Sequence, residues 1–394
     1  QCKAKELFES KSKKDHSDLP VLSATQENGI VFRNDLDIDI KFDTHTALSN
    51  YKVVSPGDYI ISLRSFQGGF ELSEKRGIIS PAYTVFAFNN QEKNKQNSTF
   101  WKYLFKRYDF IESLKRLTFG IRDGKAISFN QFSTLKLSFP NFDEQNKIAT
   151  LLHELDRTIT LHEEKKCQLE RLKSALLQKL FADENGNPAV RFKDFSEAWE
   201  SRKLFDVIVK IIDFRGRTPK KMGLNWSERG HLALSALNVK DGFIDFSTDA
   251  HYANEILYKK WMSGNELLKG QVLFTTEAPM GNVAQVPDDS GYVLSQRTIS
   301  FVSNNSEITD NFLAVVLRSS KVQRALSTLA SGGTAKGVSQ STLSQLIMVI
   351  PISLDEQQKI ERIIRIVEEL TRLYQNKLEI LTELKKSLLQ KMFI

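Results

Sequence analysis

Residues 143–148 read Asp-Glu-Gln-Asn-Lys-Ile, and nearly the same six residues return at 355–360 as Asp-Glu-Gln-Gln-Lys-Ile, an offset of 212. A second pair, Leu-Leu-Gln-Lys-Leu-Phe at 176–181 and Leu-Leu-Gln-Lys-Met-Phe at 388–393, keeps the same offset. A continuous helix enforces a constant offset, because one inserted residue would turn its apolar face by about 100°. The chain is therefore predicted to contain a duplicated unit that ends in a long helix.

The repeat extends upstream of both predicted helices. Leu-Ser-Ala at 22–24 matches Leu-Ser-Ala at 234–236, and each block closes on a proline, Pro140 or Pro351, just before its helix. Chance similarity is the alternative, but the shared order and offset argue against it. The predicted organisation is a first domain at 1–142, a spacer helix at 143–182, a linker at 183–198, a second domain at 199–354 and a second spacer helix at 355–394.

The opening of the second block has no counterpart at this offset. The block begins with Trp-Glu-Ser-Arg-Lys-Leu at 199–204, and position 199 minus 212 falls before residue 1. We therefore expect that the first domain lacks its opening in this chain and that the natural protein extends upstream of Gln1.

Both helical segments carry apolar residues at steps of three and four, a pattern typical of helices that pack lengthwise, although plain core packing gives the same stripe. About 38 residues at about 1.5 Å each make a rod of about 57 Å, too long for one small domain to cover. We expect an antiparallel coiled-coil spacer whose seam contains Ile148, Leu152, Leu155, Ile159, Leu169, Leu176, Ile360, Ile364, Val367, Tyr374, Leu381 and Leu388.

The two blocks have a different texture, with short apolar runs separated by Gly, Asn, Asp and Pro. These runs predict strands at 59–61, 84–88, 272–274 and 298–302, whereas 100–119 and 310–329 have helical spacing. The predicted fold class is α/β (α+β): two tandem-duplicated mixed α/β domains separated by two long antiparallel coiled-coil helices.

The net charge of +7 is mildly suggestive of an anionic partner, and most of the excess lies in the two blocks. Several block loops place basic or amide side chains beside glycines, as base reading in a DNA groove requires. For any one residue, a solvated loop charge is the alternative. The candidate DNA-binding residues are Arg64, Gln67, Lys75, Arg76, Arg122, Lys125, Arg215, Arg217, Lys220, Lys221, Gln296, Arg297 and Lys336.

No catalytic or metal-binding pattern stands out in the sequence. Asn-Pro-Ala-Val at 187–190 departs from the Asn/Asp-Pro-Pro-Tyr/Phe loop of amino-methyltransferases, and no phosphate-binding Gly-x-x-x-x-Gly-Lys-Ser/Thr loop occurs. Pro287-Asp288 could begin a nuclease site, but no Glu-x-Lys follows. The six histidines and two cysteines lack metal-ligand spacing. We expect a non-catalytic, cytoplasmic protein without metal, and no segment long and apolar enough for a membrane helix.

The arrangement resembles the specificity (S) subunit of type I restriction-modification systems. The resemblance covers the whole chain and rests on the two Asp-Glu-Gln-x-Lys-Ile segments after prolines and on the two Leu-Leu-Gln-Lys endings. It also rests on the junction Pro-Ala-Val-Arg-Phe-Lys-Asp-Phe at 188–195 and on Gly-Arg-Thr-Pro at 216–219. No single motif would suffice, whereas their order and duplication are specific.

The resemblance implies two target-recognition domains, each reading one half of a bipartite, interrupted sequence in double-stranded DNA. It implies helical regions that set the gap between the halves. Two methyltransferase (M) subunits would methylate adenine using S-adenosylmethionine, and restriction/translocase (R) subunits would cleave. S-adenosylmethionine, ATP and Mg are then expected only in the partner subunits. The alternatives are a coiled-coil scaffold whose blocks bind protein, and a self-sufficient nuclease or methylase.

Overall fold

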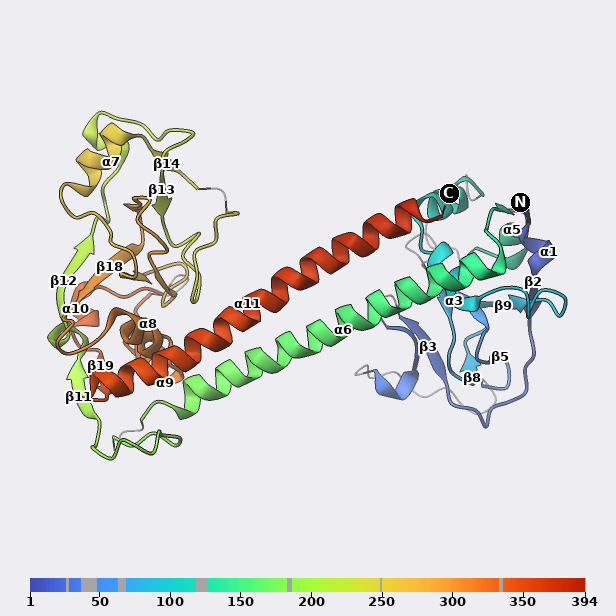
Figure 1. Cartoon of the computed structure of the whole chain (residues 1–394), viewed down its shortest axis with the longest axis horizontal. Coiled ribbons are helices and arrows are strands. Elements are labelled where there is room, and N and C mark those ends of the chain that lie inside the picture. Colours follow the sequence, from blue (N-terminus) through green and yellow to red (C-terminus); the bar gives the residue numbers. More distant parts are fainter. Residues whose placement is uncertain are drawn as a thin grey trace. The chain divides into compact units, whose positions relative to one another are not determined.

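The computed structural model describes residues 1–25, 28–36, 48–62, 69–117, 127–182, 186–248, 250–332 and 336–393. The chain forms two compact units (Figure 1). Unit 1 consists of Gln1–Glu164 and Gln375–Ile394, and unit 2 of Lys165–Tyr374. None of the helices in these described ranges has the length and apolar character of a membrane span.

Unit 1 is built on a four-stranded antiparallel sheet in the order β2-β9-β6-β7. The sheet packs against an aromatic core in which Phe8, Tyr59 and Phe86 are fully or almost fully buried. The strands are β1 (Cys2–Lys3), β2 (Phe8–Lys11), β3 (Leu22–Thr25), β4 (Gly29–Phe32), β5 (Lys52–Val54), β6 (Tyr59–Ile61), β7 (Phe70–Leu72), β8 (Gly77–Ile79), β9 (Thr84–Phe88) and β10 (Lys136–Leu137). The short helices are α1 (Ala4–Leu7), η1 (Arg33–Asp35), α3 (Ser98–Leu104), α4 (Tyr108–Leu117) and α5 (Phe129–Ser133).

Unit 2 has a four-stranded antiparallel sheet in the order β12-β18-β15-β16 and a three-stranded sheet β14-β13-β17. The strands are β11 (Glu200–Lys203), β12 (Ile208–Asp213), β13 (His231–Leu234), β14 (Tyr252–Ala253), β15 (Val272–Thr275), β16 (Val283–Gln285), β17 (Val293–Leu294), β18 (Thr298–Ser303) and β19 (Ile347–Ile350). The helices are η3 (Leu204–Asp206), η4 (Pro219–Met222), α7 (Glu255–Met262), α8 (Asp310–Arg318), α9 (Ser320–Leu329) and α10 (Gln340–Leu343).

The two four-stranded sheets have the same topology. In each sheet the first strand along the chain pairs with the last one, β2 with β9 and β12 with β18. The last strand also pairs with the first strand of a hairpin, which is β6–β7 in unit 1 and β15–β16 in unit 2. The four strands expected from the apolar runs are present as β6, β9, β15 and β18. The prediction of two mixed α/β domains is confirmed. The matching sheets explain why the sequence repeat extends beyond the helices.

Two segments with helical spacing each contain two helices in the structure. The segment 310–329 breaks at Ser319, whose backbone is extended (φ −62°, ψ 146°). Ser319 ends α8 and also caps α9, because its side chain accepts from the Val322 amide at 3.4 Å. The segment 100–119 is likewise divided into α3 and α4. A helix break of one residue can leave the apolar residues at nearly helical spacing, so the spacing alone does not reveal it.

The opening strands correct the constant offset. β1 pairs antiparallel with β10, as β11 pairs with β19, and a one-turn helix follows each opening strand. In each one-turn helix, an acidic side chain accepts a hydrogen bond from the backbone amide of the last strand residue, three positions earlier. Glu6 accepts from Lys3 and Asp206 accepts from Lys203, each at 3.3 Å. The openings therefore correspond at an offset of 200. The offset of 212, which placed this opening before Gln1, holds only from Leu22 and Leu234 onward. The second block is longer than the first between its opening and this point.

Two long helices, α6 (Phe142–Lys179) and α11 (Leu354–Lys391), each contribute to both units (Figure 1). In unit 1, Lys385 Nζ on α11 lies 2.6 Å from Asp156 Oδ1 on α6. In unit 2, Lys173 Nζ on α6 lies 3.7 Å from Glu368 Oε1 on α11. Within each unit the helical segments therefore lie alongside one another. The residue numbers rise along one helix as they fall along the other, so the segments run antiparallel.

The seam residues divide into two groups. Ile148 and Leu152 belong to the core of unit 1, and Ile360 and Ile364 belong to the core of unit 2, so these positions seat the helix on its own block. Leu155 and Val367 are also buried. The remaining residues of the predicted seam are half-buried: Ile159, Leu169, Leu176, Tyr374, Leu381 and Leu388.

A buried glutamine attaches the first helix to its block. Gln145, the third residue of the repeated Asp-Glu-Gln motif, is 1% exposed. Its side-chain oxygen accepts from the Asn97 amide at 3.0 Å, and its Nε2 donates to the Pro140 carbonyl at 2.9 Å. Asn97 is the residue that caps α3. One side chain therefore joins the start of α6, the preceding proline and the first turn of α3.

The second glutamine repeats this attachment. Gln357 is fully buried; its Oε1 accepts from the Thr309 amide at 3.1 Å, and its Nε2 donates to the Pro351 carbonyl at 3.1 Å and the Glu307 carbonyl at 2.9 Å. Thr309 caps α8 as Asn97 caps α3. The glutamine of the motif thus has the same structural role in both copies.

The junction motif at 188–195 is held by Glu356, the acidic residue that precedes Gln357 in the second copy of the repeated motif. Arg191 donates to both oxygens of the buried Glu356 carboxylate, at 2.7 and 2.9 Å. The hydrogen bonds to Glu356 raise the pKa of the Arg191 guanidinium above its ordinary value. Lys359 also pairs with Asp194, at 2.8 Å. The segment around 188–195 is therefore fixed to the start of α11.

Candidate nucleic-acid interface

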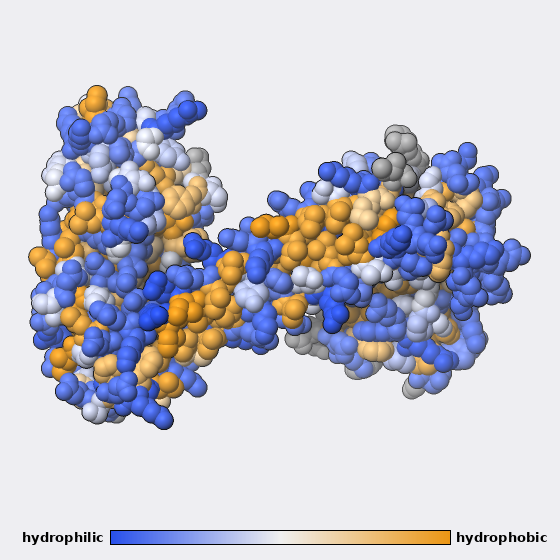
Figure 2. Space-filling view, in the orientation of Figure 1, coloured by the Kyte–Doolittle hydropathy of each residue, from blue (hydrophilic) through white to orange (hydrophobic). Residues whose placement is uncertain are grey.

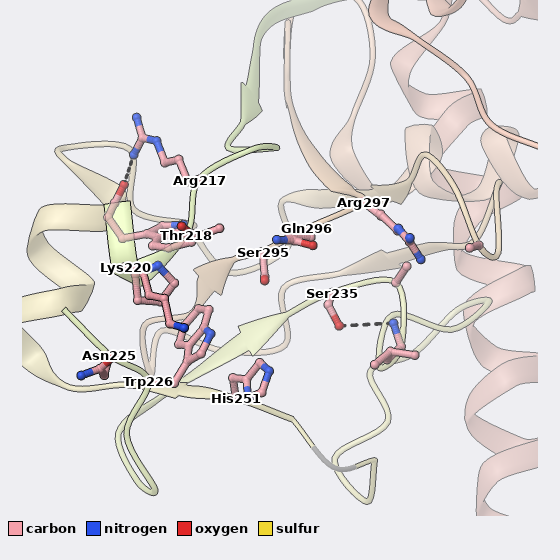
Figure 3. Close-up of a pocket in the computed structure, with 15 residues that line it drawn as sticks. Arg217, Thr218, Lys220, Asn225, Trp226, Ser235, His251, Ser295, Gln296 and Arg297 are labelled. Carbon is pink, nitrogen blue, oxygen red and sulfur yellow. Dashed lines mark hydrogen bonds between the residues drawn. The ribbon is translucent and has the colours of Figure 1, made fainter. Parts of the chain in front are cut away.

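A cavity of about 410 Å³ in unit 2 brings together four of the candidate DNA-binding residues (Figure 3). Its walls come from the segment that enters η4, the loop after η4, the end of β13 and the turn between β17 and β18. It is lined by Arg217, Thr218, Pro219, Lys220, Asn225, Trp226, Ser235, Ala236, Leu237, His251, Trp261, Ala278, Ser295, Gln296 and Arg297. Cations and amides converge here from segments that are far apart in the sequence.

The basic wall is shaped by the Gly-Arg-Thr-Pro segment. Gly216 has φ +82°, a conformation that favours glycine, and Thr218 Oγ1 caps η4 by accepting from the Lys221 amide at 3.4 Å. Arg217 lies 4.0 Å from the centroid of the Phe214 ring and donates to the Trp261 carbonyl. The guanidinium is therefore oriented by the protein, whereas Lys220 is exposed.

The opposite wall is the turn that carries Gln296 and Arg297, and both side chains are exposed. Arg297 has φ +63°, which is unusual for a residue with a side chain. Its carbonyl holds this conformation by accepting from the amide and the hydroxyl of Thr276, at 2.8 and 3.2 Å. Figure 3 shows Ser295 and Gln296 in the middle of the group, with Arg297 beyond them. The fixed turn presents an amide and a guanidinium to an incoming ligand.

Three aromatic lining residues were missed by the sequence analysis. The rings of Trp226 and His251 are stacked with centroids 5.2 Å apart, and Trp226 and Trp261 lie 5.3 Å apart. Trp261 Nε1 donates to the Leu294 carbonyl at 2.9 Å, which fixes its indole. Aromatic residues interleaved with cations are typical of nucleic-acid sites. The signal in the sequence was weak, because the three residues are spread over 226–261.

The other candidates of unit 2 lie outside the lining of this cavity. Arg215 donates from Nε to both oxygens of Asp213 at 2.9 Å, so its charge is already paired. Burial opposes ionisation of Asp213, but its hydrogen bonds from Arg215 and Gln340 bring its pKa below the ordinary value. Lys221 Nζ donates to the Gly216 carbonyl at 2.8 Å, and Lys336 is exposed.

The candidates of unit 1 are described only in part. Lys75 and Arg76 lie between β7 and β8; Lys75 Nζ is 4.6 Å from the centroid of the Phe32 ring, and Arg76 is exposed. The predictions for Arg64, Gln67, Arg122 and Lys125 fall outside the described residues.

Asp288, the one acid that the sequence offered for a nuclease site, has structural partners. Asp288, in the Pro-Asp pair noted above, accepts from the Ser290 amide at 2.9 Å and from the Tyr292 hydroxyl at 3.0 Å. Burial and this hydrogen bond to Asp288 raise the pKa of Tyr292 to about 12. Across the described ranges, no group of three or more His, Cys, Asp or Glu residues is placed to hold a metal ion.

Duplicated α/β domains joined to long helices, one with a cationic and aromatic cavity, are features of a modular DNA-recognition protein. The chain belongs to the type I restriction modification DNA specificity family, whose domain model matches residues 1–171 and 196–383. This finding confirms the resemblance drawn from the repeated motifs.

Individual relatives agree with this assignment. The chain is 23% identical over 347 residues to the type I restriction enzyme MjaVIII specificity subunit of Methanocaldococcus jannaschii, covering 86% of this chain and 78% of that protein. Its fold is similar to the type I restriction-modification S subunit from M. genitalium, with a TM-score of 0.61, 14% identity and coverage of 100% and 95%. A chain from a structural study of complex assembly and conformational transition of the type I R-M system matches with a TM-score of 0.53, 15% identity and coverage of 100% and 96%.

Proposed function

We propose that this chain is the non-catalytic, DNA-reading subunit of a cytoplasmic type I restriction-modification enzyme, and that each block reads one half of a bipartite, interrupted target. The observation that carries the proposal is the duplicated attachment of block to helix. Gln145 and Gln357 make equivalent contacts, and the ion pairs Lys385–Asp156 and Lys173–Glu368 stand at equivalent positions. Proteins that read spaced half-sites commonly repeat the reading module in this way.

The cavity of unit 2 supports separate roles for its side chains. An exposed Arg suits the O6/N7 edge of guanine, and Gln suits adenine, so we assign base reading to Gln296 and Arg297. Lys220 is exposed at the rim and suits phosphate. In unit 1 we assign DNA contact to Lys75 and Arg76, and Arg64, Gln67, Arg122 and Lys125 remain predictions.

The exposed faces of the long helices support a protein partner. Figure 2 shows apolar residues at the surface of α6 and α11. We propose that two methyltransferase subunits bind there and that restriction/translocase subunits join them. S-adenosylmethionine, ATP and Mg would then act in those partners, which methylate adenine or cleave. The large exposed apolar residues described on the helices are Phe142, Leu151, Leu161, Leu172, Ile366, Leu370, Leu373, Ile380 and Leu384.

A methylome tests the proposal directly. The chain is expressed with its methyltransferase partner in a host, and methyladenine is mapped in that host and in one that has the partner alone. We expect new methyladenine at one split motif only when the chain is present. Unchanged methylation, with the partner shown to be active on addition of another specificity subunit, contradicts the proposal and favours the scaffold alternative.

The two kinds of DNA contact predict different mutant phenotypes. Arg297→Ala is expected to reduce discrimination at one base pair of the second half-site by about 1–3 kcal/mol, because a base-edge contact is lost. Lys220→Ala is expected to weaken binding to all sequences and to reduce the slope of log affinity against log salt by about 1. Anisotropy titrations at several salt concentrations measure both, with Lys259→Ala, an exposed cation on α7, as the control. Equal effects of all three variants would exclude these assignments.

A further inference from the structure

The last residue of α8, Arg318, holds a buried charge between the second block and the helix α11. Its side chain is 4% exposed. Arg318 Nε donates to Asp241 Oδ1 at 2.7 Å, and its Nη2 donates to Glu368 on α11. Lys173 Nζ, on α6, completes the cluster at 3.7 Å from Glu368 and 4.0 Å from Asp241. Four charged groups thus connect both long helices to the segment that contains Asp241, all within unit 2.

That segment, residues 235–245, reaches from the ion cluster to the cavity, and we name it the recognition loop. Its first residues, Ser235, Ala236 and Leu237, line the cavity beside Gln296. Leu237 is 62% exposed, although it is apolar. The first residues of the recognition loop therefore form one wall of the proposed DNA site, and Asp241, further along the loop, pairs with Arg318.

The recognition loop is well fixed at both of these places. Asn238 is fully buried; its Oδ1 accepts from the Ser235 amide at 2.8 Å, and its Nδ2 donates to the Ala233 carbonyl at 3.0 Å. At the turn, the Gly242 amide donates to the Val283 carbonyl at 2.7 Å. The recognition loop is therefore an ordered segment that runs from the cavity to Asp241.

The turn of the recognition loop is packed directly on the guanidinium. Gly242 has φ +88°, and a Cβ atom there would lie 2.7 Å from Arg318 Nη2 and 2.9 Å from its Cζ. Only glycine fits both the conformation and the space. The guanidinium of Arg318 is thus one of the groups that hold the turn, beside the hydrogen bond from the Gly242 amide to Val283.

Arg318 remains charged despite its burial. Burial disfavours the charged form, but the hydrogen bonds that Arg318 donates to the carboxylates of Glu368 and Asp241 outweigh it and raise the pKa of Arg318 above its ordinary value. Removal of one partner from a buried ion cluster leaves an unpaired charge, which is strongly unfavourable. The paired charges therefore favour the arrangement in which the loop, α8 and α11 are held together.

Unit 1 provides the contrast. Its interhelical pair Lys385–Asp156 stands at the position equivalent to Lys173–Glu368, and Asp156 also accepts from a block residue. That residue is Tyr103, whose hydroxyl donates at 2.8 Å, and it lies on α3 rather than on a loop of the reading face. Among the residues of unit 1 that the structure describes, the interhelical pair is linked to α3, whereas in unit 2 it is linked through Arg318 to a cavity-lining loop.

We propose that Arg318 is a positioning residue for DNA reading by the second block. Through Asp241 it fixes the recognition loop to α11, so that the loop and Gln296 present one surface to the second half-site. The residue does not touch DNA; it acts through the loop. This inference rests on the proposed function and adds the element that sets the register of the second reading surface.

The test uses Asp241→Asn in the complete complex with the methyltransferase partner. Asp241 is 53% exposed, so this variant removes the negative charge that pairs with Arg318 without leaving a buried cavity. Duplexes carry the motif from the methylome, with single base-pair changes in either half, and the ratio of cognate to altered affinity is measured. We expect discrimination at the second half-site to fall about tenfold, as for loss of a good base contact, and discrimination at the first half-site to stay unchanged. Asp241→Glu should restore part of it.

The control is Asp156→Asn, which removes the interhelical carboxylate of unit 1, the counterpart of Glu368, and should leave the second half-site unaffected. The inference is overturned if Asp241→Asn discriminates like the wild type at the second half-site. It is also overturned if both half-sites lose discrimination equally, since a general loss of stability has that result. A wild-type complex that discriminates at neither half-site overturns the proposed function itself, which separates the two failures.

Discussion

A chain whose residues 1–142 are replaced by the corresponding domain of another specificity subunit is expected to keep one half of its target and exchange the other. The physical reason is that each block has its own sheet and its own core, and the two cores share no residue. The contacts that read one half-site then depend only on the loops of one block. The methylome of the exchanged chain measures the result.

The structure specifies what the incoming domain must carry. In unit 1 the block meets the helices through Asn97, which binds Gln145 and Asn146, and through the Tyr103 hydroxyl on Asp156. Phe100 packs on Phe393 with ring centroids 5.1 Å apart. A donor domain that keeps these three block side chains should seat correctly.

The reciprocal exchange, of residues 199–354, is the control for the modular reading. It should change the other half of the motif and leave the first intact. If either exchange alters both halves, while the exchanged chain still supports methylation, the two blocks do not read independently and the modular interpretation is wrong.

Substitution of Gln357 by alanine is expected to destabilise unit 2 by about 3 kcal/mol, because each buried polar group left without a partner costs about 1–3 kcal/mol. The variant deprives the Thr309 amide, the Glu307 carbonyl and the Pro351 carbonyl of their partner. It also releases the first turn of α8 from the start of α11. The measurement is the denaturant midpoint followed by tryptophan fluorescence.

Tryptophan fluorescence suits this measurement, because Trp199, Trp226 and Trp261 all lie in unit 2. Gln358→Ala is the matched control, since that side chain is exposed next to the buried one. Gln145→Ala should have the equivalent effect on unit 1. A midpoint for Gln357→Ala equal to that of Gln358→Ala would show that the buried contacts contribute no net stability.

The sequence by itself determined the duplication, the two long helices and the main strands of both blocks. These features are local or periodic: a helical stripe repeats every three or four residues, and a constant offset survives only where no residue can be inserted. The glutamine of the repeated motif was visible as a repeated residue. Its role was not, because its partners at Asn97 and Thr309 lie 48 residues away along the chain.

Only the tertiary structure decided which charges can face a ligand. Arg215 and Arg217 are neighbours in one basic segment, yet Arg215 is paired with Asp213 while Arg217 lines the cavity. The aromatic residues Trp226 and His251 lie together there because β13 and β14, which follow them in the chain, pair with each other. The link from Arg318 to Asp241 spans 77 residues. Such contacts depend on side-chain geometry between distant segments, which local sequence patterns do not encode, whereas helix and strand periodicity is imposed residue by residue on the chain itself.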